Sequence, residues 1–135
     1  TYSIEGADLG CAINANTGVI TAGNEAGTIT VRATDGPSDA HDDITLTLVE
    51  VKNAALTKAA IPADGASTST ASAVVTPQGR ALTYSIEGAD LGCAINANTG
   101  VITAGNQAGT ITVRATDGPS GAHDEVTLTL TAPAP

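Results

Sequence analysis

Two short clusters combine an imidazole with two carboxylates and have the clearest potential for metal or acid-base chemistry. They are His41-Asp42-Asp43 and His123-Asp124-Glu125. Consecutive residues of an extended segment point to opposite sides, so the side chains of one cluster cannot easily converge on one ion, and zinc would need ligands from elsewhere. We interpret both clusters as solvated loops and predict no metal site.

A third acidic group surrounds a turn. Asp35, Asp39 and Asp42 lie beside Gly36 and could offer oxygen ligands to a weakly bound calcium ion. The corresponding stretch later in the chain has Gly121 in place of Asp39. A site that both stretches needed would not vary there, so weak calcium binding stays open and no ligand set is assigned.

The two cysteines, Cys11 and Cys93, are one position of a sequence that occurs twice. A disulfide between them would need Cα atoms within about 7 Å. Equivalent points of two successive β-domains lie much further apart, since a strand residue spans about 3.3 Å. We expect two buried thiols that pack as small hydrophobic residues, with a bridge to another chain as the alternative.

Catalytic patterns are missing from the sequence. It has no nucleophile elbow with a Ser, His and Asp order and no phosphate-binding glycine loop. The two aromatic residues, Tyr2 and Tyr84, alternate with apolar neighbours and are predicted to be core residues and not a glycan platform. We therefore predict that the chain is not an enzyme and has no catalytic, cofactor-binding or metal-binding residues and no cofactor.

An internal repeat positions all these residues. Residues 1–48 and 83–130 align without a gap at an offset of 82, and four positions differ: Glu25 and Gln107, Asp39 and Gly121, Asp43 and Glu125, and Ile44 and Val126. Both copies must therefore fold alike. The period is too long for a helical solenoid and suits one small β-sandwich per repeat.

Alternation of apolar and polar residues predicts strands throughout each copy. Ile29, Val31 and Ala33 share one face of the segment 28–34, and threonines alternate with apolar residues in 44–48 and 126–130. Turn signals such as Asp35-Gly36-Pro37-Ser38 separate these segments. The pattern predicts an all-β sandwich.

The stretch between the copies, residues 53–82, is rich in Ala, Ser, Thr and Pro. We interpret it as two strands, one ending near Ile61 and one over 70–76, with Ala71, Ala73 and Val75 on one face. A complete seven-strand domain then covers residues 53–132, and residues 1–52 are the last five strands of another domain. Residues 133–135 begin a stiff Pro-Ala linker.

Three motifs in order carry a resemblance to a known family: Leu82-Thr83-Tyr84-Ser85-Ile86, Ile95-Asn96-Ala97-Asn98-Thr99-Gly100-Val101-Ile102 and Val113-Arg114-Ala115-Thr116-Asp117-Gly118. The chain resembles the bacterial cadherin-like and immunoglobulin-like repeats of surface proteins and large adhesins. The resemblance implies tandem Greek-key β-sandwiches in an array that is extracellular or at the cell surface of a bacterium or archaeon.

Cadherins proper hold calcium between domains at three acidic places, and this sequence departs from the pattern at each. It has Val75-Thr76-Pro77-Gln78 at the second-strand exit, Gly105-Asn106-Gln107-Ala108 in the middle loop and Glu50-Val51-Lys52-Asn53 in the linker. Calcium needs six to eight oxygen ligands. We therefore expect no cadherin-type calcium site.

Composition narrows the classes of partner. The net charge is −9, with seven acids to one base in residues 1–48, which disfavours nucleic acid. Phe, Met and Trp are lacking, so a core of Ile, Val, Leu and Ala should give modest stability. No apolar run is long enough to span a membrane, and no signal peptide is seen. Because the chain begins at Thr1, we expect a processed chain or a fragment.

These features predict a structural repeat of an extracellular fibre, filament or surface stalk. A sandwich that lacks two strands exposes edges, which favours assembly with other copies by strand complementation. The alternatives are an adhesive module that recognises a cell-surface protein or glycan and an accessory module of a larger secreted enzyme.

Overall fold

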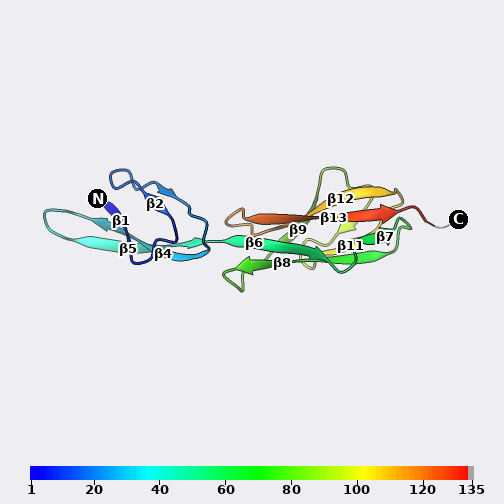
Figure 1. Ribbon diagram of the computed structural model, residues 1–135, viewed down its shortest axis with the longest axis horizontal. Coiled ribbons are helices and arrows are strands. Elements are labelled where there is room, and N and C mark those ends of the chain that lie inside the picture. The colour runs from blue at the N-terminus through cyan, green and yellow to red at the C-terminus, as the bar shows by residue number, and fades with distance from the viewer. Residues whose placement is uncertain (134–135) are drawn as a thin grey trace. The chain divides into compact units, whose positions relative to one another are not determined.

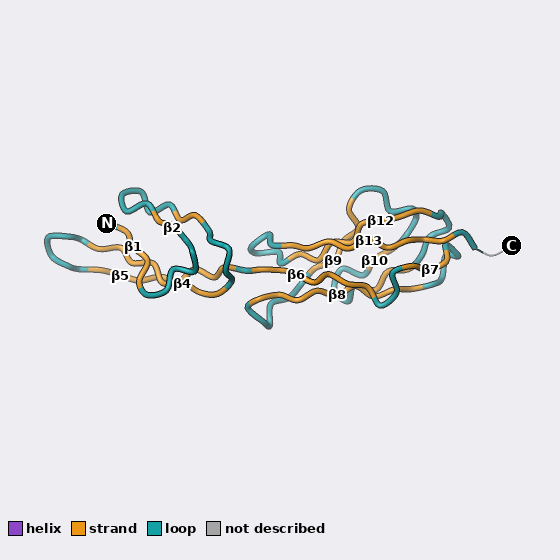
Figure 2. Tube along the Cα trace, viewed as in Figure 1, coloured by secondary structure: helices purple, strands orange, loops and turns teal. Residues whose placement is uncertain are grey.

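The computed structural model describes residues 1–133, and every regular element in that range is a β-strand (Figure 2). The chain divides into two compact units, Thr1–Glu50 (unit 1) and Val51–Pro135 (unit 2). The predicted all-β, immunoglobulin-like sandwich fold is confirmed.

Unit 1 contains five strands. They are β1 (Tyr2–Glu5), β2 (Ala12–Ile13), β3 (Ile20–Thr21), β4 (Gly27–Thr34) and β5 (His41–Leu48). The order β1-β4-β5 forms one antiparallel sheet, and β2 and β3 form a short hairpin. Three buried side chains form the core between them: Cys11, Ile29 and Val31.

Unit 2 has eight strands in two four-stranded sheets (Figure 1). They are β6 (Glu50–Leu56), β7 (Ala60–Pro62), β8 (Thr68–Thr76), β9 (Thr83–Glu87), β10 (Ala94–Ile95), β11 (Val101–Thr103), β12 (Gly109–Thr116) and β13 (His123–Thr131). The sheet orders are β10-β11-β8-β6 and β7-β13-β12-β9. Ten buried residues pack between the sheets.

The prediction of seven strands for this domain was wrong by one, because its first strand is divided. β6 belongs to the sheet of β8, whereas β7 joins the other sheet and runs parallel to β13. The buried Ser69 holds the crossing point: its hydroxyl accepts from the Lys58 amide at 3.1 Å and donates to the Lys58 carbonyl at 2.7 Å. Sequence alternation predicts strands but not such a change of sheet.

The expected boundary after residue 52 lies within β6, two residues beyond the division after Glu50. Of the predicted Pro-Ala linker at 133–135, residues 134 and 135 lie outside the described part of the chain.

One of the four differences between the copies follows from backbone geometry. Asp39 and Gly121 occupy the same turn with φ values of 62° and 77°. Side chains disfavour this left-handed region, although Asp tolerates it better than most. The position therefore suits glycine, and its variation needs no ligand-binding explanation.

The Asp39→Gly substitution should stabilise unit 1 slightly, by up to about 1 kcal/mol, because it relieves the left-handed strain. Urea unfolding followed by hydrogen exchange in peptides from β4 and β5 would measure the change. Gly121→Asp in unit 2 is the matched control and should shift stability in the opposite direction. Equal signs for the two substitutions would contradict this explanation.

Candidate functional site: an open sandwich face

Residues 51–82, here called the covering segment, close one side of unit 2. In this segment β8 pairs with β11 and β7 pairs with β13. Its side chains Ile61, Ala63 and Ala71 are 2%, 2% and 5% exposed and form part of the core cluster. The covering segment therefore supplies both edge pairing and core packing to unit 2.

Unit 1 has the same acceptor residues without a covering segment. Leu128 of unit 2 is 0% exposed, whereas its counterpart Leu46 is 37% exposed. Ile102 and Leu130 are buried, and their counterparts Ile20 and Leu48 are partly exposed. We call Ile20, Ala22, Leu46, Leu48 and the outer edges of β3 and β5 the acceptor face.

A hollow of about 170 Å³ lies at one end of the acceptor face. Its lining includes Ala22, Gly23 and Leu48. At the equivalent place in unit 2, the covering segment is held by backbone hydrogen bonds: the Ala63 amide donates to Thr131 at 2.8 Å and the Gly65 amide donates to Gly105 at 3.2 Å. The hollow in unit 1 therefore corresponds to the place that residues 63–65 occupy in unit 2.

The aspartate that begins the Asp-Gly-Pro-Ser turn has different partners in the two units. Asp117 is 1% exposed, and Arg80 of the covering segment donates to both of its carboxylate oxygens, at 3.1 and 3.0 Å. Hydrogen bonds from Arg80, and then from Ser120, lower the pKa of Asp117. The counterpart in unit 1, Asp35, is exposed and is bonded by Ser38 of its own turn.

The side chains of the histidine cluster in unit 2 serve three separate purposes. His123 Nδ1 lies 3.1 Å from the carbonyl of Gly121 in its own turn. Asp124 accepts from the Ala54 amide of the covering segment at 2.9 Å. Glu125 forms a salt bridge with Arg114 on the neighbouring strand. The three side chains of this cluster therefore do not point toward one common ligand.

In unit 1 the cluster diverges in the same way. His41 Nδ1 lies 3.0 Å from the Asp39 carbonyl, and Asp43 forms a salt bridge with Arg32 at 2.8 Å. Asp42 is exposed, with the Asp43 amide donating to it at 3.1 Å. Within residues 1–133, no three His, Cys, Asp or Glu side chains are grouped as metal ligands would be.

Sequence reasoning missed the two acidic contacts that hold the covering segment, at Asp117 and Asp124. One signal was available: Arg80 is a single base in the turn that leads into the second copy, and nothing in its own neighbourhood pairs it. Its partner is 37 residues away in sequence, so local patterns could not identify it.

Both cysteines are in the core, as expected, and are free thiols with 7% and 8% exposure for Cys11 and Cys93. Each packs as an apolar residue in its cluster. The Gly105 amide also donates to Cys93 Sγ at 3.4 Å. The two thiols are almost equally buried, although the cores around them differ. Their rates of labelling therefore compare how often each unit unfolds locally.

A thiol reagent should label Cys11 at least about tenfold faster than Cys93, because a unit with a smaller core opens more often. Single-cysteine variants, Cys93→Ser and Cys11→Ser, would give the two rates by mass spectrometry under native conditions. Equal rates would show that the missing cover does not weaken unit 1.

The tyrosine prediction holds in one copy. Tyr84 packs against the core cluster of unit 2. Tyr2 was predicted to be a core residue, but it is 38% exposed, so that prediction was wrong. In unit 2 the Ala71 carbonyl approaches Gly100, beside the Tyr84 ring, and unit 1 has no equivalent of that strand.

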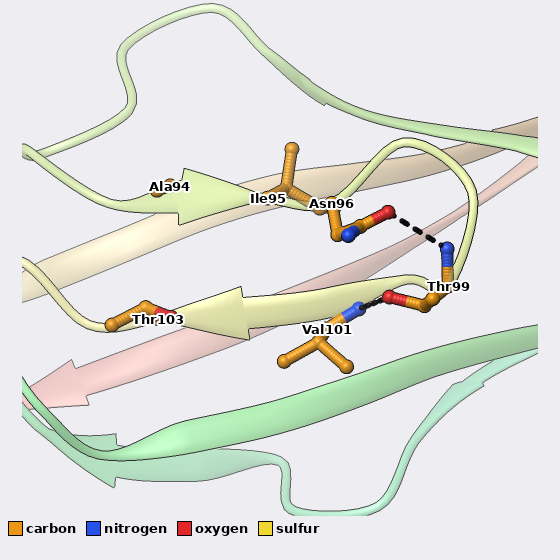
Figure 3. Close-up of a pocket in the computed structure, with 6 residues that line it drawn as sticks. All are labelled: Ala94, Ile95, Asn96, Thr99, Val101 and Thr103. Carbon is orange, nitrogen blue, oxygen red and sulfur yellow. Dashed lines mark hydrogen bonds between the residues drawn. The ribbon is translucent and has the colours of Figure 1, made fainter.

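A shallow depression of about 520 Å³ lies on the β10-β11 hairpin (Figure 3). Its lining is aliphatic or small and polar, without a charged side chain. The Asn96 side-chain oxygen accepts from the Thr99 amide at 3.0 Å, and the Thr99 hydroxyl accepts from the Val101 amide at 3.4 Å. The side-chain oxygens of Asn96 and Thr99 therefore already accept hydrogen bonds from the hairpin backbone.

The two four-stranded sheets of unit 2, with a first strand that changes sheet, form an immunoglobulin-like β-sandwich. The structure is similar to mouse cadherin-23 repeats EC22-24, with a TM-score of 0.50 and 20% identity over 98% of this chain and 52% of that one. Thus the chain spans about half the length of that protein fragment.

Two other solved structures are similar at lower scores. The protocadherin gammaB4 extracellular domain has a TM-score of 0.45 and 18% identity over 96% of this chain and 28% of that one. Drosophila N-cadherin EC1-3 has a TM-score of 0.45 and 14% identity over 98% of this chain and 54% of that one. No protein-family model and no curated protein sequence gives a significant match.

A search of the described residues for helices that could cross a membrane finds none.

Proposed function

We propose that the chain is a structural repeat of an extracellular fibre, filament or surface stalk whose units are completed by strand complementation. The observation that carries this proposal is the contrast between matched residues. Leu46 and Leu128 both lie in a Thr-Leu-Thr-Leu sequence but are 37% and 0% exposed. A unit with this face open is suited to joining a neighbour.

Two further features support the proposal. Nearly identical copies suit a part whose role is to repeat, since four of 48 aligned positions differ. The two differences in charge, at Asp39 and Glu25, lie in loops, and the apolar faces keep their residues apart from Ile44 and Val126. Repetition of the apolar faces favours a contact between units over recognition of a ligand by loops that vary.

Surface labelling and electron microscopy would test the function together. Antibodies against the purified chain should label intact producing cells, and negative-stain images of the labelled material should show rods or fibres with a regular repeat. Labelling confined to permeabilised cells, or isolated compact particles on the surface, would contradict a fibre or stalk.

Binding to host proteins or glycans is the outcome that would favour an adhesive module. A glycan array and a cell-binding assay with the full 135-residue chain would provide the measurement. Saturable binding that survives Leu46→Asp, which alters the acceptor face, would show recognition independent of assembly and would contradict a purely structural role.

A further inference from the structure

We propose that the acceptor face of unit 1 binds a polypeptide with the sequence pattern of the covering segment, supplied by a further repeat outside residues 1–135. This inference rests on the proposed function and names the partner of its joint. Unit 2 provides the template, because its own face is closed by such a segment along β11 and β13 (Figure 1).

Edge pairing in unit 2 determines the register expected on unit 1. Ile102 pairs with Ser69 and Leu130 pairs with Ile61. On unit 1 the incoming segment should therefore place its Ser69 equivalent opposite Ile20 and its Ile61 equivalent opposite Leu48. A one-residue shift would turn Ile61 away from the core, so burial selects this register.

Space for the segment exists on unit 1. A Cβ atom on Gly100 would lie 2.6 Å from the Ala71 carbonyl oxygen, which shows how closely the covering segment approaches unit 2. A Cβ on the equivalent Gly18 would meet the Tyr2 ring at 3.3 Å as its nearest neighbour. With the hollow beside Ala22, this leaves the path of the segment open in unit 1.

Charge also favours this occupant. Residues 51–82 carry three bases, Lys52, Lys58 and Arg80, against one acid, whereas residues 1–48 carry seven acids against one base. Arg80 has a ready partner on unit 1, since Asp35 occupies the position of Asp117. Asp42 likewise occupies the position of Asp124, which holds the Ala54 amide.

The number of covering segments indicates where the segment that closes unit 1 would come from. Residues 1–135 contain two acceptor units and one covering segment, which unit 2 uses. Exchange of that segment between two copies of the chain would open one face for each face it closed. Self-exchange therefore buries no additional area, and closing unit 1 requires a segment from a further repeat.

The first test uses a synthetic peptide of residues 51–82 and the full 135-residue chain. Native mass spectrometry should show a saturable 1:1 complex, and hydrogen exchange should slow in β3 and β5 of unit 1. No saturable binding, or slowing confined to β11 and β13, would overturn the inference. A concentration-dependent homodimer that excludes the peptide would also overturn it, because a second copy would then cover the face.

Matched variants test the contacts. A peptide with Ile61→Asp should bind at least about 100-fold more weakly, because Ile61 is fully buried in the template. On the acceptor, Asp35→Asn should weaken binding about tenfold, whereas Asp39→Asn, which removes the same charge from the same exposed turn, should have little effect. Equal effects of Asp35→Asn and Asp39→Asn would overturn the proposed Arg80 contact.

The acceptor core provides a second comparison. Leu46→Asp should abolish peptide binding, and Thr45→Asp, on the opposite side of β5, should preserve it. Binding retained by Leu46→Asp would overturn the inference. Peptide binding in a protein that forms no fibres on cells would contradict the proposed function and leave this inference standing.

Discussion

Replacing Leu128 by alanine is expected to lower the free energy of unfolding of unit 2 by about 2–5 kcal/mol, the usual cost of truncating a fully buried leucine. The side chain is 0% exposed between the two sheets. The same replacement at Leu46, which is 37% exposed, should destabilise unit 1 by less than about 1 kcal/mol. The two substitutions are chemically identical, and each leucine lies between two threonines.

Hydrogen exchange during urea unfolding would measure both values in one protein. The β5 and β13 peptides can be told apart because Ile44 and Val126 differ. Similar losses at the two leucines would show that unit 1 is already closed in solution. Adding the peptide of residues 51–82 should raise the cost of Leu46→Ala toward that of Leu128→Ala.

The Arg80–Asp117 ion pair should make the stability of unit 2 sensitive to acid. Its guanidinium lowers the pKa of Asp117 in the folded state. A lowered folded pKa contributes stability above the unfolded value, near 3.9, and that contribution is lost as pH falls through the folded pKa. The urea concentration at the midpoint of unfolding of unit 2 should therefore decrease as the pH is lowered below about 4.

Asp117→Asn should lower the urea midpoint of unit 2 at pH 7 and should reduce the change in that midpoint with pH. Arg80→Met should lower the midpoint by a similar amount. Asp35→Asn is the control in unit 1 and should change little, since Asp35 lies exposed without an arginine partner. An unchanged acid slope in Asp117→Asn would show that this pair does not hold the covering segment.

Asp64 acts in the same pH range and must be separated from Asp117. The Ser67 amide and hydroxyl, and the Ala66 amide, bond its carboxylate and lower its pKa to about 2. Because Asp64 stabilises the turn between β7 and β8, some acid slope should remain in Asp117→Asn. Adding Asp64→Asn should remove that remainder.

Much of the fold was predictable from the sequence because burial repeats with the period of a strand. The alternation of Ile29 and Val31 identified β4, and the segment with Ala71 was correctly interpreted as a strand and not as a linker. Motifs that follow one another in order indicated the cadherin-like sandwich.

The remaining features depend on long-range contacts that no local pattern records. Tyr2 and Tyr84 have the same neighbours in sequence, yet Tyr2 is exposed and Tyr84 packs on the core. Asp35 and Asp117 differ in the same way. The division of the first strand at Lys58 depends on a bond to the distant Ser69. The presence of a covering segment in unit 2 and not in unit 1 accounts for the tyrosine and aspartate differences.

The place of the covering segment in the chain also affects the order of folding. During synthesis, residues 51–82 follow unit 1 and precede β9 to β13, so the first acceptor face that they meet is that of unit 1. Their permanent partners in β11 and β13 are made later. If the acceptor face of unit 1 is still open at that stage, it would compete for the segment until β11 and β13 emerge.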